Sequence, residues 1–242
     1  MIIYKYFRWN KYTKRLFTDN ELYFGRSSEY NDPFEFAAKL HLNGDQIIRY
    51  IKRMPKWKQP AMIYLLKQAK SPADWFIEYY ETQVKSSGMC CFTESFDNIL
   101  MWAHYADNHQ GICVAFDTDL MEDQDTHFYK VKYRKTLPTI SMPWSEKKQI
   151  RHETTKYYDW KYEREVRAIR QFNKEDVSNE ERIWHINKNA IVGLFLGCRM
   201  KRWKSDTIRK LFDANNYHVP VALMEICKGT INYKLSPRYL RK

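Results

Sequence analysis

Residues 160–169 read Trp-Lys-Tyr-Glu-Arg-Glu-Val-Arg-Ala-Ile and place two carboxylates and two guanidinium groups within five positions. The segment is typical of a strand, predicted over 162–170, along which successive side chains alternate between the two faces. Glu163, Glu165 and Arg167 are therefore expected on one face. Two carboxylates aligned in this way repel each other unless a cation, a ribose hydroxyl or a proton transfer needs them. The alternative interpretation is a solvated edge strand whose charges form cross-strand ion pairs.

The charge and the aromatic content favour a polyanionic partner. The 242 residues include 41 Lys and Arg against 29 Asp and Glu, a net charge of +12, and the pI is about 9.3. This balance favours nucleic acid, a nucleotide or an acidic protein as a partner, and solvated basic faces are the alternative source of the charge. Aromatic residues make up 16% of the chain, a content that builds cores and also stacks on bases.

Cysteine usage and hydropathy predict a cytoplasmic protein. The five cysteines are an odd number and include no C-x-x-C pair, which argues against a disulfide framework. No apolar run approaches the ~18 residues that a membrane span requires. We therefore expect a cytoplasmic chain that is not exported and has no membrane partner, and the oligomeric state is left open.

The pattern along the chain predicts one α+β domain over residues 1–242, with a mixed, mostly antiparallel sheet and helices inserted at about 45–87. Strands are expected over 2–6, 21–26, 88–93, 111–116, 128–133, 162–170, 190–196, 219–227 and 230–235. A polar connection is expected between the first two of these. Helices are expected over 45–54, 60–69, 72–85, 98–107, 145–157 and 205–214.

Residues 31–33, Asn-Asp-Pro, predict a fixed turn. Asp before Pro is driven out of the helical region, and Asn and Asp side chains bond nearby backbone groups. We expect this turn to hold Phe34 in the core and to direct Tyr30 or Glu35 toward a pocket.

The segment 91–111 carries two His and a Trp close to a strand end, which raises the question of a metal site. His104 and Asp107 would share a helix face, but Asp107 and His109 flank the end of that helix and no second ligand pair has metal spacing. No metal is expected. Neither G-x-S-x-G, G-x-G-x-x-G nor a P-loop occurs, so a bound nucleotide would need another kind of pocket.

Five motifs in one order give the chain its resemblance to a bacterial family of unknown function. They are Y-K-Y, N-D-P-F-E, M-W-x-H-Y-A-D-x-H-x-G, W-x-Y-E-x-E-x-R and I-x-x-L-x-L-G. In this chain they are Tyr4 to Tyr6, Asn31 to Glu35, Met101 to Gly111, Trp160 to Arg167 and Ile191 to Gly197. Together they run across roughly residues 3 to 200.

The order of these parts also resembles the ADP-ribosyltransferase fold, including toxins of that fold that modify DNA and RNA. That family uses Arg or His on its first strand, a Ser/Thr-rich strand and a later Glu-x-Glu strand. The matching positions here are Lys5, then Thr93 and Ser95, then Glu163 and Glu165. Lys5 departs from the Arg or His of the family.

This resemblance implies nicotinamide adenine dinucleotide (NAD) as the cofactor and assigns roles to individual residues. Glu165, with Glu163, would be catalytic, since a carboxylate stabilises an oxocarbenium-like centre as the nicotinamide bond breaks. Aromatic side chains would stack on the cofactor and Arg26 or Arg167 would pair with its pyrophosphate. The cofactor-binding set is Lys5, Tyr6, Arg26, Tyr30, Asn31, Thr93, Ser95, Trp102, His104, Tyr105 and Arg167. In the alternative interpretation Tyr6 and Trp102 are core residues and Arg167 only neutralises Glu165.

The resemblance thus implies an enzyme that uses NAD to modify nucleic acid or protein, in phage defence or as a toxin. The alternatives are a non-catalytic nucleic-acid- or protein-binding module of a defence system, and a structural member with a degenerate pocket. Convergence of Lys5, Thr93, Trp102 and Glu165 on one cleft discriminates between them, because a binding module has no reason to gather them. We expect Glu163 and Glu165 at the wall of that cleft, with Glu165 nearer its centre.

Overall fold

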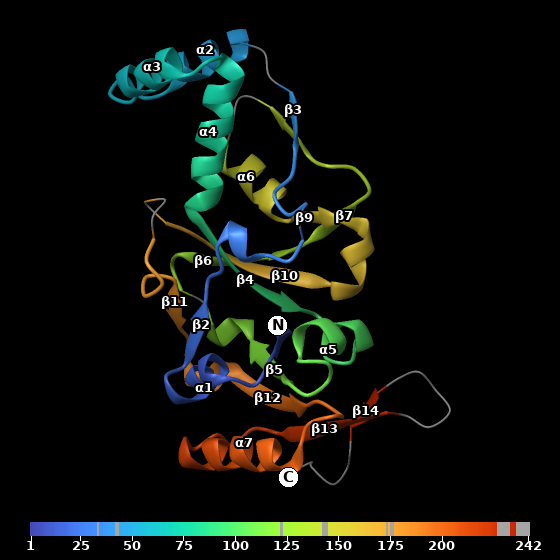
Figure 1. Cartoon of the computed structure of the whole chain (residues 1–242). Coiled ribbons are helices and arrows are strands. Elements are labelled where there is room, and N and C mark those ends of the chain that lie inside the picture. Colours follow the sequence, from blue (N-terminus) through green and yellow to red (C-terminus); the bar gives the residue numbers. More distant parts are fainter. Residues whose placement is uncertain are drawn as a thin grey trace.

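A computed structural model describes residues 1–242 except 33, 42–43, 122, 142–144, 173, 175–176, 227–232 and 236–242. Its main sheet has eight described strands (Figure 1). They are β1 (Ile2–Phe7), β4 (Ser87–Thr93), β5 (Ile112–Asp117), β6 (Thr126–Lys130), β10 (Glu165–Gln171), β12 (Ile191–Leu196), β13 (Val221–Ile226) and β14 (Tyr233–Leu235). The order is β14-β13-β12-β5-β1-β4-β10-β6, and only β12 with β13 is a parallel pair. The predicted mixed, mostly antiparallel sheet is confirmed.

Three two-stranded sheets and the helices surround this sheet. The small sheets pair β2 (Glu21–Tyr23) with β11 (Ile183–His185), β3 (Lys39–His41) with β8 (Thr139–Ser141), and β7 (Lys132–Arg134) with β9 (Thr155–Tyr157). The α-helices are α1 (Lys11–Thr18), α2 (Gly44–Arg53), α3 (Gln59–Gln68), α4 (Pro72–Lys85), α5 (Ile99–Tyr105), α6 (Glu146–Glu153) and α7 (Arg202–Ala214). Short 3₁₀ helices span Ser27–Glu29, Thr118–Leu120, Tyr158–Glu163 and Lys188–Ala190. None of the described helices has the length and apolar character that a membrane span requires.

The sheet buries both of its faces, because its central strands alternate between two sets of apolar side chains. Ile112, Val114 and Phe116 of β5 point to one face, where they pack in a cluster with residues of α1 and α7. Cys113 points to the other face and packs with Trp102 of α5. The helices thereby cover the two faces from segments far apart in the sequence.

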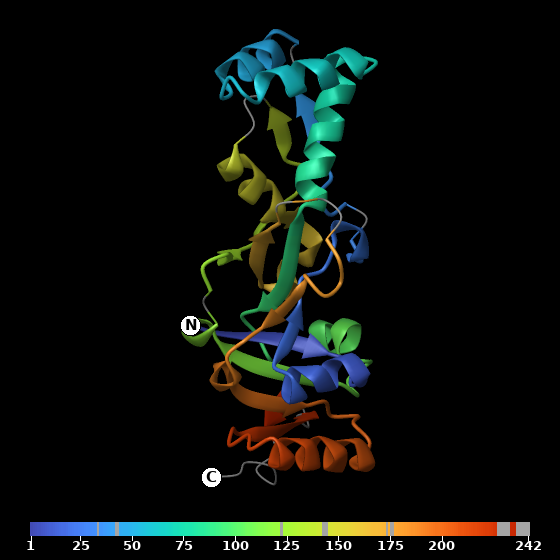
Figure 2. The same cartoon turned by 90° about the vertical axis from the view of Figure 1, so that its left-hand side faces the viewer.

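α2, α3 and α4 form a helical lobe (residues 44–85) at one end of an elongated molecule, and α7 lies at the other end (Figures 1 and 2). Ile47, Ile51, Trp75 and Phe76 are buried in a second cluster, which also includes Ile140 of β8. The hydroxyl of Tyr80 lies 2.6 Å from Nδ1 of His152 in α6. This contact links the lobe to the rest of the chain.

α1 corrects one expectation, since the chain between the first two strands was expected to be a polar connection. The side chain of Asn10 accepts hydrogen bonds from the backbone N–H groups of Tyr12 and Thr13 and caps the helix. Leu16 and Phe17 are buried on its inner face. The polar side chains that suggested a loop belong to the outer face of a short amphipathic helix.

Three other expectations fail, two of them where strand pairing overrides local pattern. The helix expected over 145–157 ends at Glu153, because Thr155–Tyr157 forms β9 and pairs with β7. The single strand expected over 128–133 is divided at Val131 between β6 and β7, which belong to different sheets. The strand expected over 162–170 begins only at Glu165, after a 3₁₀ helix and a left-handed Arg164 with φ 45°.

A tight loop joins α5 to β5 and explains why the helix expected over 98–107 ends early. Asp107, Asn108 and His109 all have positive φ, at 52°, 52° and 69°. Gly111 follows, and a Cβ there would lie 2.2 Å from the carbonyl oxygen of Phe7. No side chain fits at this close approach of two backbones.

We expect Gly111→Ala to lower the free energy of unfolding by about 1–3 kcal/mol, as overpacking does, because an added Cβ would overlap backbone atoms of Phe7 and Ala106. Urea denaturation followed by circular dichroism measures the change. Gly44→Ala is the matched control, since a Cβ at Gly44 meets nothing within 4 Å. Equal stability of the two variants would contradict the packing argument.

Candidate functional site

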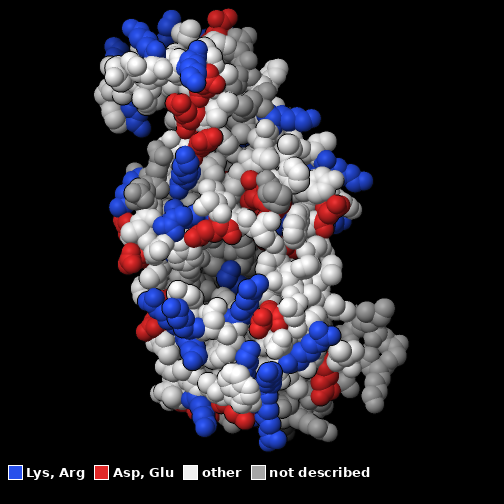
Figure 3. Space-filling view, viewed as in Figure 1, with Lys and Arg blue, Asp and Glu red and all other residues white. Residues whose placement is uncertain are grey.

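The main cleft opens where two neighbouring strands of the sheet separate. β1 and β4 share a single residue pair, Tyr4 with Thr93, whereas β1 pairs with β5 at six positions. Beyond that pair the strands diverge, and a cleft of about 1170 Å³ lies between them, lined by Lys5 and Phe7 from one and Cys91 from the other. Figure 3 shows a hollow in the middle of this face, with Lys and Arg side chains below it and an acidic side chain at its upper edge.

Three residues expected to form the site lie on three adjacent strands and line this cleft. They are Lys5 on β1, Thr93 on β4 and Glu165 on β10. Thr93 is the direct cross-strand neighbour of both Tyr4 and Glu165, so the three strands are in register at this point. The sheet itself therefore brings together distant parts of the chain, and the Thr93 hydroxyl donates to the carbonyl of Glu163, 70 residues further on.

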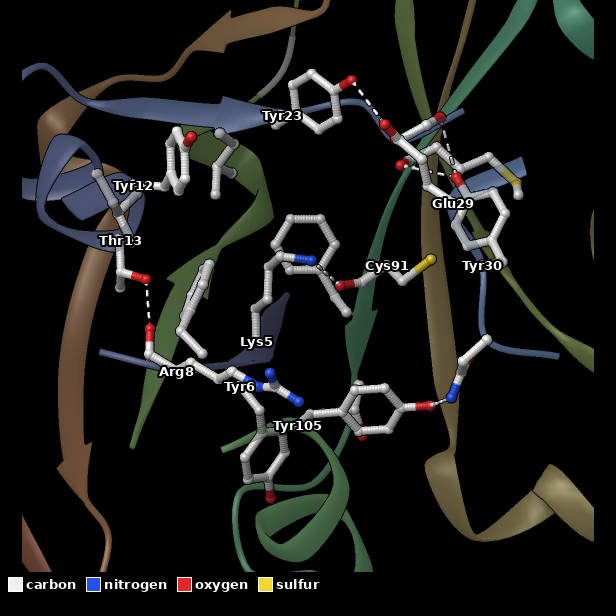
Figure 4. A pocket seen from close by; sticks show the side chains of 18 of the residues that line it. Lys5, Tyr6, Arg8, Tyr12, Thr13, Tyr23, Glu29, Tyr30, Cys91 and Tyr105 are labelled. Atoms are coloured by element: carbon white, nitrogen blue, oxygen red, sulfur yellow. Dashed lines mark hydrogen bonds between the residues drawn. The ribbon is translucent and has the colours of Figure 1, made fainter. Parts of the chain in front are cut away.

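Lys5 stands in the middle of the cleft (Figure 4). Its ammonium donates a 2.8 Å hydrogen bond to the carbonyl oxygen of Cys91 and lies 5.6 and 5.5 Å from the ring centres of Phe7 and Phe92. No carboxylate among the described residues lies within ion-pair distance of it. Lys5 thus keeps its charge available for an anion.

Five side chains form a carboxylate cluster at one end of the cleft: Glu35, Glu163, Glu165, Lys156 and Arg167. Lys156 Nζ lies 2.6 Å from Glu163 and 3.2 Å from Glu165. Arg167 Nε lies 2.8 Å from Glu165, and its Nη1 lies 2.8 Å from Glu35. All five side chains are at most 6% exposed. Lys156 and Arg167 therefore supply the positive charge that Glu163 and Glu165 need to lie close together.

Charge is unequal within the carboxylate cluster, because three carboxylates face two cations. Burial alone would raise the pKa of Glu165, but Arg167 and Lys156 lower it to about 2. Burial raises the pKa of Glu163 and of Glu35. Glu165 is thus ionised at neutral pH, and the cluster attracts a further positive charge.

Glu163 reaches the cluster by a route different from the one expected. It ends the 3₁₀ helix rather than lying on the strand, so the prediction that it shares a strand face with Glu165 is wrong. The left-handed Arg164 turns the chain between them, and both carboxylates still line the cleft. The face shared by Glu165 and Arg167 is confirmed by their 2.8 Å ion pair.

Tyr105 and Asn31 extend the hydrogen-bond network into the cleft. The Tyr105 hydroxyl donates to Glu163 at 2.5 Å and accepts from the Asn31 side chain at 3.2 Å. Burial and the Glu163 charge raise the pKa of Tyr105, so its hydroxyl stays protonated and donates. Glu163 is therefore held by a phenol on one oxygen and an ammonium on the other.

The turn after Tyr30 behaves partly as expected. Asp32 accepts a 2.9 Å hydrogen bond from the backbone N–H of Phe34, which confirms a side-chain-to-backbone turn, and Pro33 lies outside the described residues. Tyr30 and Glu35 both line the cleft. Phe34 is 61% exposed, so its predicted place in the core is wrong. The chain there turns inward only at Glu35, which the ion pair with Arg167 holds.

The remaining residues of the cofactor-binding set divide into two groups. Tyr6, Tyr30, Asn31, His104 and Tyr105 line the cleft together with Lys5 and Thr93. Arg26, Ser95, Trp102 and Arg167 do not. Trp102 is fully buried, donates to the carbonyl of Phe96 and packs edge-on against Tyr6, as the core alternative has it.

Arg26 and Ser95 are engaged elsewhere, and so is Arg167. Arg26 donates to Tyr23 and Asn179, each at 2.6 Å, and the Ser95 hydroxyl donates to Asp97 at 2.6 Å. Arg167 is 1% exposed and donates hydrogen bonds to the carboxylates of Glu165 and Glu35 and to the backbone carbonyl of Glu153. Arg167 therefore neutralises and positions Glu165, as the alternative interpretation of this residue predicts.

Sequence reasoning missed the residue at the centre of the carboxylate cluster. Lys156 was placed in a polar helix, and no local signal marks it, because its position follows from the pairing of β9 with β7. It also missed Arg8 and Tyr12, which line the cleft from β1's end and α1. The sequence did hold a signal for α1, because Asn10 is a good helix cap and the apolar pair Leu16 and Phe17 follows it. That signal places Tyr12 in the first turn of a helix.

A family model of known proteins matches a part of the chain that contributes to this site. Residues 101–168, which run from α5 into β10, match a family model described as protein of unknown function (DUF2971). This match confirms the expected similarity to a family of unknown function over these residues. No curated protein and no solved structure matches the chain.

Proposed function

We propose that the chain is an ADP-ribosyltransferase-like enzyme of the bacterial cytoplasm that cleaves NAD and modifies nucleic acid or protein, in phage defence or as a toxin. The convergence of Lys5, Thr93 and Glu165 from three adjacent strands on one cleft carries the proposal. Trp102, the fourth residue expected in the cleft of an enzyme, lies in the core instead.

The cleft suits a dinucleotide in size and charge. Its volume of about 1170 Å³ exceeds the roughly 300–1,000 Å³ typical of small-ligand pockets. Lys5, which has no carboxylate partner among the described residues, supports an anionic group such as pyrophosphate. Arg8 is exposed and lines the same part of the cleft (Figure 4).

The carboxylate cluster suits the other end of the dinucleotide. Breaking the bond between ribose C1′ and the nicotinamide nitrogen sends the bonding pair to nicotinamide and leaves positive charge on the ribose. An ionised Glu165 in a cluster with excess negative charge stabilises that positive charge. The acceptor atom then attacks C1′, and Glu163, whose pKa burial raises, takes the acceptor's proton.

Calorimetry with NAD and an assay of released nicotinamide test this function. Wild type is expected to bind NAD and to release nicotinamide when cell nucleic acid or protein is added. Lys5→Met is expected to weaken binding at least about 10-fold, because a charge-assisted hydrogen bond is lost. Lys201→Met, at an exposed lysine outside the cleft, is the matched control. Absence of binding at millimolar NAD would overturn the enzyme and favour the binding module.

A further inference from the structure

The tip of the helical lobe carries an unusual concentration of unpaired positive charge. Residues 44–70, here called the basic hairpin, contain α2, α3 and their connection. They hold seven cations, Arg49, Lys52, Arg53, Lys56, Lys58, Lys67 and Lys70, against the one carboxylate of Asp45. All seven are exposed, and none forms an ion pair with a described residue. Figure 3 shows several Lys and Arg side chains on the lobe, together with acidic ones.

The cations of α2 point away from the protein. Ile47 and Ile51 are buried against the lobe's cluster and define the inner face of α2. Arg49, Lys52 and Arg53 lie on the opposite side of the helix, since successive residues are about 100° apart around it. The outward face of α2 is therefore a row of positive charge that forms no ion pair within the described part of the chain.

Large aromatic side chains stand exposed among these charges. Trp57, in the connection, is 77% exposed and Tyr64 of α3 is 63% exposed. Lys58 Nζ lies 4.9 Å from the Trp57 ring centre. These exposed rings contribute little to the packing of the lobe and leave flat apolar area in water beside the cations.

The apolar residues of α3 do not form one face, which argues against insertion into a membrane. Met62 and Leu66 face the lobe's cluster. Tyr64 and Lys67 lie on the opposite, outward side, and the exposed Ile63 and Leu65 lie on different flanks of the helix. A membrane-binding helix would present a continuous apolar face with cations along its border. Here an aromatic ring and a cation occupy the outermost positions.

We propose that the basic hairpin binds single-stranded nucleic acid, with phosphates on its cations and bases stacked on Trp57 and Tyr64. Positive charge that follows a backbone, combined with exposed aromatic rings, is the arrangement that single strands require. A second hollow, of about 620 Å³, begins beside it and is lined by Tyr50 and Lys58 of the hairpin, Tyr79 of α4 and Lys174. This hollow gives the nucleic-acid strand a polar path away from the basic hairpin. The surface shares no lining residue with the main cleft, so the inference is independent of the proposed function.

Fluorescence anisotropy of a labelled oligothymidine of about 20 nucleotides, titrated with the full chain at several salt concentrations, tests this proposal. The triple variant Arg49→Glu, Lys52→Glu, Lys56→Glu is expected to weaken binding at least about 10-fold and to lower the salt dependence. The control Lys201→Glu, Arg202→Glu, Lys210→Glu makes the same charge change at exposed cations elsewhere and is expected to weaken binding less than about 3-fold. Circular dichroism checks that both variants fold.

Trp57→Ala separates stacking from charge. It is expected to weaken binding at least about 5-fold while leaving the salt dependence unchanged, because stacking on a base releases no counterion. Equal losses in the two triple variants would overturn the proposal. Equal affinity for a duplex of the same length, or binding to phosphatidylserine vesicles without binding to the oligonucleotide, would overturn it as well.

Discussion

Glu165→Gln is expected to slow nicotinamide release by about 100- to 1,000-fold while leaving NAD affinity nearly unchanged. The amide keeps the size of the side chain but cannot stabilise positive charge on the ribose. The fold is expected to survive, because Arg167 keeps its ion pair with Glu35 and Lys156 keeps its ion pair with Glu163. Calorimetry measures the affinity, and single-turnover release of nicotinamide measures the rate.

Glu153→Gln provides the matched control for this substitution. Glu153 is fully buried and close to the carboxylate cluster, since its backbone carbonyl accepts from Arg167, but its side chain does not line the cleft. Its variant is expected to release nicotinamide at the wild-type rate. A Glu165→Gln protein with wild-type turnover, or a Glu153→Gln protein that is equally slow, would show that the carboxylate of Glu165 does not act on the substrate.

Arg167→Met is expected to lower the free energy of unfolding by about 3–5 kcal/mol at neutral pH. Arg167 is 1% exposed and neutralises both Glu165 and Glu35. Methionine fills the volume but leaves Lys156 as the one cation for the three buried carboxylates. Urea denaturation gives the difference, and Arg164→Met, at a 59% exposed arginine of the same segment, is expected to cost at most about 1 kcal/mol.

The cost of Arg167→Met is also expected to depend on pH. The folded pKa of Glu165 is about 2, below its unfolded value, so its contribution to wild-type stability is present above the unfolded pKa and is lost as pH falls through the folded one. The variant lacks most of that contribution. The difference between the two proteins should therefore be full near pH 7 and shrink from roughly pH 5 toward pH 2. A constant difference across this range would assign the loss to packing rather than charge.

Local sequence signals located the elements whose residues carry a strong pattern. The helix expected over 72–85 is α4 with the same bounds, and the structure has Ser71 as its cap and Pro72 at its first position. The apolar runs at 88–93, 111–116 and 190–196 predicted β4, β5 and β12 to within a residue or so. These strands are buried on both faces, so their hydrophobicity is continuous and needs no partner to be recognised.

The sequence was less informative where a segment has no stable conformation of its own. Residues 155–157 look helical in isolation but form β9 because β7 lies beside them. Residues 160–164 look like part of a strand, but the carboxylate of Glu163 is drawn to Lys156 and Tyr105, and the chain turns at Arg164. In both cases contacts made elsewhere outweigh a weak local preference.

By itself, the sequence determined the mixed α+β class and the main strands, because these are properties of residue type and short-range pattern, and the resemblance of its motifs made Lys5, Thr93 and Glu165 candidate site residues. Only the tertiary structure decided that β1 and β4 separate to open a cleft, and that Lys156 and Arg167 divide three buried carboxylates between them. Lys5 and Cys91 are 86 residues apart, and Arg167 and Glu35 are 132 apart. Charges at such separations meet only when the whole sheet has formed, and burial then sets their interaction energy.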